Sequence, residues 1–224
     1  MLVRPYSKVR TAGARDPERT RKDILQAAFR EVYRSGFQSA GLNGILANAR
    51  VTKGALYYHF ASKEALGYAI VEEIIAPHNR GEWLRPLERC KDPIDALIGI
   101  VQALPVRPEA VRGGCAWNNL ALEMSPLDAG FRKRLERVFH DRRRGVASAL
   151  RAGQAHGTVR RGADPAETAG FLIAAVQGYA SLAKNAQDPT VMKEGIRNIA
   201  GWLESLRATK GRPHGAKARK SQDS

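Results

Sequence analysis

The segment Val51–Lys63, with the sequence VTKGALYYHFASK, constrains the fold and function of this chain more than any other stretch. Thr52 has a side chain suited to a helix N-cap, because it can accept a hydrogen bond from a backbone N–H of the first turn. At 3.6 residues per turn, Leu56 and Phe60 fall on one apolar stripe, and Tyr58 lies nearly opposite. The spacing therefore predicts a short helix with one buried face and one polar, aromatic face.

The outward face of this predicted helix offers hydrogen-bond donors and has no acidic residue. Its members are Lys53, Gly54, Ala55, Tyr57, Tyr58 and His59. Such a face suits a helix whose N-terminal end approaches DNA base edges while its hydroxyls and cations hold phosphates. The alternative is an ordinary surface helix with exposed aromatics. Two tyrosines and a histidine in a row, outside any core pattern, are uncommon on such a surface.

The net charge of +15 is unevenly spread. Residues 1–63 carry +8 and residues 208–224 carry +4, whereas residues 64–207 carry only +3. No Asp or Glu occurs between Val32 and Lys63. A cationic surface without competing anions favours a polyanion, because binding releases the counterions of that polyanion. The N-terminal part is therefore the candidate DNA-binding part.

The sequence gives little support for a membrane protein, a secreted protein, a metalloprotein or an enzyme. No apolar run approaches the roughly 20 residues of a membrane helix, so we expect no membrane partner. Residues 1–20 lack the apolar core of a signal peptide, and Cys90 and Cys115 form no disulfide framework, so we expect a cytoplasmic protein. The histidines are scattered, and nucleophile-elbow, phosphate-loop and dinucleotide motifs are missing. We therefore predict no metal, no cofactor and no catalytic residue.

The apolar pattern has helical periodicity, and no segment alternates as a strand does, so the fold class is predicted to be all-α. Helices are expected over about 16–35, 42–49, 53–60, 62–77, 115–124, 128–156, 164–185 and 189–207, with a further helix start at Asp92. The first helix has two possible starts, Asp16 before a proline or a capping box at Thr20. Residues 105–113 are expected to form a loop.

The motif VTKGALYYHF at residues 51–60, followed by Ser62-Lys63-Glu64, resembles the recognition-helix signature of the TetR family of bacterial transcriptional repressors. The match continues upstream through Ile24, Ala27-Ala28, Gly36-Phe37 and residues 42–46, and the specific motifs cover about residues 20–70. The chain departs from the family at two positions. Arg50 stands where the turn usually has Gly, and Gly41 stands near the usual Thr or Ser. Arg50 offers an added phosphate contact.

The resemblance implies a helix-turn-helix DNA-binding head of three helices, followed by a helical effector-binding and dimerisation domain. We expect a disordered basic arm over 1–15, the head over 16–62, the second domain over 63–207 and a disordered basic tail over 208–224. The arm has two interpretations, contact with the DNA backbone or minor groove, or a frayed and solvated terminus.

The resemblance also carries the DNA contacts over to positions of this chain. They are Asn43, Thr52, Lys53, Gly54, Ala55, Tyr57, Tyr58, His59 and Lys63. Lys53 is suited to a guanine edge, Ala55 to a thymine methyl and Tyr57 to a phosphate.

Candidates for a small-molecule site come from amides and a carboxylate among aromatic residues. They are Trp83, Cys115, Trp117, Asn118, Asn119, Glu123, Phe131, Gln177 and Tyr179. The alternative for each is core packing with satisfied polar groups. Cys115 with Cys90 as partner is a candidate redox sensor, against the commoner buried structural thiol.

The last two helices, 164–185 and 189–207, either cap the core or form a four-helix bundle with a second copy. Gly170, Ala174 and Gly178 leave a flat strip for another helix. The family uses the bundle, and we therefore predict a homodimer on a palindromic double-stranded operator, released by an unknown small-molecule effector. Two alternatives remain: a DNA-binding protein without an effector, and an all-α enzyme.

Overall fold

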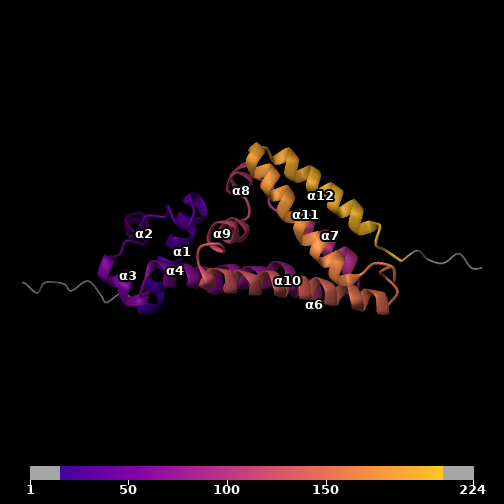
Figure 1. The fold of residues 1–224 in the computed structure, drawn as a ribbon, viewed down its shortest axis with the longest axis horizontal. Coiled ribbons are helices and arrows are strands. Elements are labelled where there is room, and N and C mark those ends of the chain that lie inside the picture. Colours follow the sequence, from indigo (N-terminus) through magenta and orange to yellow (C-terminus); the bar gives the residue numbers. More distant parts are fainter. Residues whose placement is uncertain (1–15, 209–224) are drawn as a thin grey trace, which may run out of the picture. The chain divides into compact units, whose positions relative to one another are not determined.

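The computed structural model describes residues 16–208, and over that range the fold is all-α, as predicted. The helices in chain order (Figure 1) are α1 (Pro17–Ser35), α2 (Leu42–Ala49), α3 (Lys53–His59), α4 (Lys63–Ile70), the π-helix η1 (Val71–Ile75), α5 (Ala76–Asn79), the π-helix η2 (Arg80–Leu84), α6 (Arg85–Glu88), α7 (Pro93–Gln102), α8 (Pro108–Gly113), α9 (Ala116–Met124), α10 (Ala129–Ala155), α11 (Pro165–Ala186) and α12 (Pro189–Glu204). The predicted arm, 1–15, and the predicted tail beyond Ala208 lie outside the described residues.

Aspartate followed by proline begins four of these helices. Asp16, Asp92, Asp164 and Asp188 each accept a hydrogen bond from a backbone N–H of the first turn. The proline at the first helical position lacks only an N–H that would have no partner within the helix. For α1 the structure therefore selects the start at Asp16 over the capping box at Thr20.

Two of the expected elements differ from the observed ones. One predicted helix was expected to end at Pro77. In the structure Pro77 instead lies inside α5, directly after η1, so the helical segment continues past it. A proline within an α-helix clashes with the carbonyl four residues earlier, and the wider π-helix before it makes room for the ring. The predicted loop 105–113 contains α8, because Pro108 provides a helix start that the proline-rich composition conceals.

The chain forms two compact units, and the described part of the first comprises residues 16–78 and 115–138. Its core is a single cluster that joins apolar residues of α1 to α4 with residues of α9 and α10. Phe131 is fully buried there, against Phe37 at 4.7 Å and Tyr68 at 5.0 Å between ring centroids. The predicted head, 16–62, lies within this unit, and its boundary as a separate domain stays a prediction.

The described part of the second unit comprises residues 79–114 and 139–208, with a core built from α7, α10, α11 and α12. Figure 1 shows α11 and α12 running side by side. A Cβ placed on Gly195 of α12 would lie 2.3 Å from the Tyr179 ring of α11, so the glycine is what allows this close packing. Within the described residues, no helix has the length and apolarity needed to cross a membrane.

Candidate nucleic-acid interface

The predicted recognition helix, α3, has the two faces that its sequence predicts. Leu56 and Phe60 are 1% and 3% exposed, and they anchor α3 in the core of the first unit. Tyr57 and Tyr58 are 41% and 80% exposed on the outward side. Thr52 is the N-cap, and its hydroxyl accepts a hydrogen bond from the Ala55 N–H at 3.2 Å. The aromatic residues of α3 therefore face solvent instead of completing the core.

The structure brings the nine predicted DNA-contacting residues into one unit. Seven of them form α3 and its N-cap: Thr52, Lys53, Gly54, Ala55, Tyr57, Tyr58 and His59. Asn43 is exposed on α2, and Lys63 is the first residue of α4. No acidic residue occurs anywhere from α2 through α3. The outward surface of α3 therefore has the charge and the donors that suit a DNA groove.

Arg21 of α1 joins α3 to the helical segment that follows α4. Its guanidinium donates two hydrogen bonds to the Glu73 carboxylate, at 2.5 and 2.6 Å, and lies 4.8 Å from the centre of the Phe60 ring. A bidentate arginine–carboxylate pair fixes both side chains in one geometry. These hydrogen bonds lower the pKa of Glu73 below its ordinary value of 4.5.

This lowered pKa predicts an acid-sensitive contribution to stability. A carboxylate whose folded pKa is depressed stabilises the fold fully above its unfolded pKa, and the contribution is lost as pH falls through the folded pKa. We expect the difference in unfolding free energy between the wild type and Glu73→Gln to be largest near neutral pH and to shrink as the pH falls through the lowered pKa of Glu73. Urea unfolding at a series of pH values measures this difference. A difference that does not change with pH would contradict the assignment.

The turn between α1 and α2 receives side chains from two other segments of the unit. The Glu123 carboxylate of α9 accepts hydrogen bonds from the backbone N–H groups of Phe37 and Gln38, both at 2.8 Å. The Lys63 ammonium donates to the Gln38 carbonyl at 3.0 Å and lies 5.1 Å from the centre of the Phe37 ring. Glu123 and Lys63 therefore both hold the turn that precedes the helix-turn-helix.

A hollow of about 380 Å³ lies beside α3. It is lined by Pro17, Thr20, Arg50, Val51, Thr52, Ala55, Tyr58 and His59, and none of these is acidic. Four of the predicted DNA-contacting residues thus share a concave surface with the start of α1 and with the turn before α3. Pro17 and Thr20 were predicted only as signals for the start of α1 and not as residues of this surface, because nothing in their local pattern indicates that the start of α1 packs beside α3.

The predicted ligand-binding residues divide between the two units. Cys115, Trp117, Asn118, Asn119, Glu123 and Phe131 belong to the first unit, and Trp83, Gln177 and Tyr179 belong to the second.

Several of these residues have structural contacts of their own. Phe131 is a core residue, and Glu123 holds the α1–α2 turn. Trp83 is 3% exposed, with the Arg142 guanidinium 3.9 Å from its ring centre. The Tyr179 hydroxyl accepts a hydrogen bond from the Asn198 amide at 3.0 Å. Among the described residues, the buried Oε1 of Gln177 has no hydrogen-bond partner.

The two cysteines are both reduced thiols. Burial raises the pKa of the Cys90 thiol above its ordinary value, and the thiol donates to the Leu87 carbonyl at 3.2 Å. A thiol that stays protonated at neutral pH is a poor nucleophile, which disfavours Cys90 as one half of a redox sensor.

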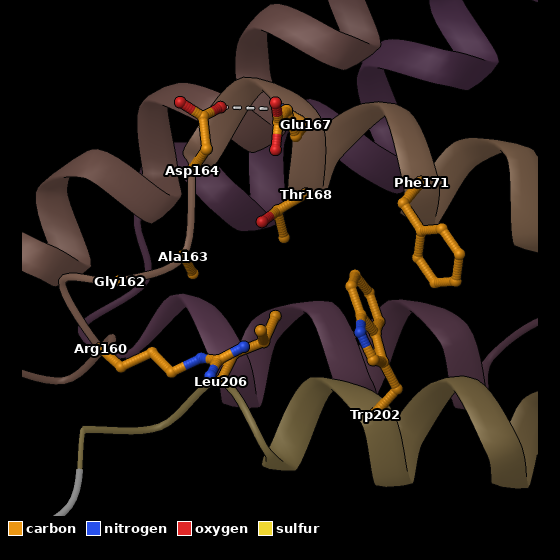
Figure 2. A pocket seen from close by; sticks show the side chains of 9 residues that line it. All are labelled: Arg160, Gly162, Ala163, Asp164, Glu167, Thr168, Phe171, Trp202 and Leu206. Atoms are coloured by element: carbon orange, nitrogen blue, oxygen red, sulfur yellow. Dashed lines mark hydrogen bonds between the residues drawn. The ribbon is translucent and has the colours of Figure 1, made fainter.

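A second hollow, of about 400 Å³, lies in the second unit beside the start of α11 and the end of α12 (Figure 2). Phe171 and Trp202 lie side by side at one end of it, with ring centres 4.8 Å apart. Arg160, Asp164 and Glu167 give the rest a mixed charge. None of the nine predicted ligand-binding residues lines this hollow.

Comparisons with known proteins match both parts of the chain. Residues 24–70 match the family described as "Bacterial regulatory proteins, tetR family", and residues 86–199 match "Tetracyclin repressor-like, C-terminal domain". An uncharacterised HTH-type transcriptional regulator of Lactococcus lactis is 30% identical over 189 residues, which cover 84% of this chain and 94% of the relative. The HTH-type transcriptional repressor DhaR of a Mycobacterium species is 30% identical over 74% of this chain and 81% of its own length.

Solved structures share the fold. A TetR transcriptional regulator of Chloroflexus aurantiacus superposes with a TM-score of 0.76 at 24% identity, covering 88% of this chain and all of that one. The reduced form of NemR from Escherichia coli superposes with a TM-score of 0.73 at 23% identity, covering 86% of this chain and all of NemR.

Proposed function

Because this chain belongs to the TetR family of helix-turn-helix transcriptional regulators, we propose that it is a homodimeric repressor that a small-molecule effector releases from a palindromic operator. The family consists of transcriptional regulators and not of enzymes, so the enzymatic alternative is set aside. The observation that carries the proposal is α3 itself, with exposed Tyr57 and Tyr58 beside Lys53 and no acid on the helix.

The dimer is proposed to form through α11 and α12. Phe171 and Leu182 of α11 are 56% and 58% exposed, which is unusual for large apolar side chains. A Cβ placed on Gly170 or Gly178 would meet no atom within 4 Å, so packing within the subunit does not account for either glycine. A flat apolar strip of this kind suits close approach by helices of a second copy. A two-fold dimer would place two α3 helices in successive major grooves, about 34 Å apart.

The effector is proposed to act through α9. This helix contains four of the predicted ligand-binding residues, and Glu123 near its end holds the backbone of the α1–α2 turn. A ligand that moves α9 would therefore displace the head through two direct hydrogen bonds. The effector need only bind the two arrangements of the heads with different affinities.

Selection of bound fragments from genomic DNA tests the proposal. The purified protein is expected to enrich fragments that share an inverted repeat, and a metabolite screen is expected to find a compound that releases them. Enrichment of a shared sequence with no releasing compound would favour the alternative without an effector. Fragments without any shared sequence would contradict the proposed repressor.

Tyr57 and Lys63 are proposed to contact phosphates, so removing either contact is expected to weaken binding without altering sequence preference. We expect Tyr57→Phe and Lys63→Ala each to lower affinity several-fold, on the operator and on unrelated DNA alike. Only Lys63→Ala should reduce the slope of log affinity against log salt, by about 1. Lys91→Ala, which removes an exposed lysine of the second unit, is the matched control.

Fluorescence anisotropy at several salt concentrations measures these effects. Thermal unfolding accompanies it, because Lys63→Ala also removes the hydrogen bond to the Gln38 carbonyl. Unchanged affinity in both variants would refute the two roles.

A further inference from the structure

The positive charge of the chain after the helix-turn-helix is concentrated on a single helix, α10. Its 27 residues include eight Lys and Arg and two acids, which gives a net charge of +6. Residues 64–207 as a whole carry only +3, so the rest of that range carries −3. Seven of the eight cations are arginines. A charge that served only solubility would be interspersed over the surface instead of being gathered on one helix.

Helix geometry aligns much of this charge on one side of α10. At 3.6 residues per turn, five exposed basic side chains fall within about 60° of one another. They are Lys133, Arg137, His140, Arg144 and Arg151, and we call them the α10 stripe. At 1.5 Å per residue the stripe extends over about 27 Å. It is continuous, because α10 is one helix from Ala129 to Ala155 (Figure 1).

The fold itself uses the opposite side of α10. Leu135, Val138 and Val146 lie on that side and are buried in the hydrophobic cores. The stripe, by contrast, contributes no side chain to either core. Packing therefore explains why α10 is apolar on one side, and it does not explain why the other side is lined with cations.

Ion pairs within the chain neutralise little of the stripe. Arg137 lies 3.4 Å from the Glu72 carboxylate, and Arg144 lies 3.4 Å from the Asp141 carboxylate. Both pairs are exposed, and exposed pairs of this kind contribute little, so a polyanion can replace them. Within residues 16–208, Lys133 and Arg151 form no ion pair. The stripe thus presents a line of charge to an external partner.

We propose that the α10 stripe binds the phosphate backbone of a second DNA segment, without sequence preference, while the α3 helices hold the operator. A guanidinium matches phosphate oxygens with two parallel hydrogen bonds, which favours an arginine-rich line for this partner. Double-stranded DNA presents one negative charge per about 1.7 Å of its axis, so a stripe of this length faces several phosphates. The stripe has no large apolar side chain to anchor a protein partner.

The proposal goes beyond operator recognition, because it makes the protein a bridge between two DNA segments. A bridging assay tests it. The selected operator is fixed on beads and saturated with the protein, and a labelled duplex without the operator sequence is added. The wild type should capture the labelled duplex. The capture should weaken with salt, because each phosphate contact releases counterions.

The test variant combines Lys133→Gln, Arg144→Gln and Arg151→Gln. It should capture at least about tenfold less labelled duplex, and the slope of log capture against log salt should fall by about 3. It should still bind the fixed operator within about twofold of the wild type, with an unchanged melting temperature, because all three side chains are exposed. Arg144→Lys with Arg151→Lys keeps the charge and should keep most of the capture.

The matched control combines Arg85→Gln, Arg89→Gln and Lys91→Gln. It removes three exposed cations of the second unit that lie outside α10, and it should capture the labelled duplex as the wild type does. A control that loses as much capture as the test variant would overturn the proposal, since overall charge would then explain the effect. Polyglutamate that competes as well as DNA, charge for charge, would also overturn it, because the stripe would then not favour phosphates.

The outcomes separate this inference from the repressor function. A wild type that binds its operator and captures no second duplex refutes the bridge and leaves the repressor standing. A test variant that loses the operator as well as the second duplex also refutes the bridge, because the stripe would then contact the operator itself. If the wild type selects no operator, the repressor fails. Capture of one unrelated duplex by another through wild type, lost in the test variant, would still support the stripe.

Discussion

Replacing Phe171 and Leu182 together by Asp is expected to dissociate the dimer and to lower operator affinity by about a hundredfold or more, because two linked heads bind far more tightly than one. Both side chains are largely exposed in the single chain, at 56% and 58%, so the subunit itself should stay folded. In the proposed dimer the two carboxylates would be buried without partners, which strongly disfavours association.

Sedimentation velocity and operator titration measure the two effects, and circular dichroism checks the fold. The matched control is Leu122→Asp with Leu127→Asp, which replaces two leucines of the first unit that are 71% and 62% exposed. The control should remain dimeric and bind the operator. A dimeric Phe171→Asp, Leu182→Asp variant would refute the proposed interface, and so would a control that dissociates equally.

Phe131→Ala is expected to give the largest loss of stability, about 3–5 kcal/mol in unfolding free energy. Phe131 is fully buried between Phe37 and Tyr68, and a Cβ on Gly67 would come within 2.4 Å of its ring. Packing this close leaves a cavity when the ring is removed. Urea unfolding followed by circular dichroism measures the loss.

Phe131→Leu is the matched variant, because it refills most of the volume and should lose markedly less stability than Phe131→Ala. A loss below about 1 kcal/mol for Phe131→Ala would mean that the ring is not an essential part of the core. That result would return Phe131 to consideration as a ligand-binding residue.

Local signals in the sequence were sufficient for most of the fold. Each Asp-Pro pair predicted a helix start, because the carboxylate caps the helix and the proline needs no partner. The spacing of Leu56 and Phe60 predicted the buried face of α3, and the exposure of Tyr58 followed from its opposite position. These features depend on residues less than two turns apart in the sequence.

Features that depend on distant contacts were beyond the sequence analysis. Glu123 was predicted to bind a ligand, and its hydrogen bonds to residues 37 and 38 join positions more than eighty residues apart. The hollow beside α3 is lined by Pro17 and Thr20 of α1 together with Arg50, about thirty residues away in the sequence. The composition around Trp83 and Phe131 suits a pocket and a core equally well, and only packing shows that both rings are buried. Pro77 continues a helix because η1 relieves its clash.

The central claim is that a symmetric pair of α3 helices binds two half-sites on one face of the DNA. The most direct measurement compares wild-type affinity for the selected operator with affinity for the same operator carrying five additional base pairs at its centre. The insertion turns one half-site by about half a helical turn. The account predicts a loss of about a hundredfold, because only one head then engages. Equal affinity for the two DNAs would contradict it.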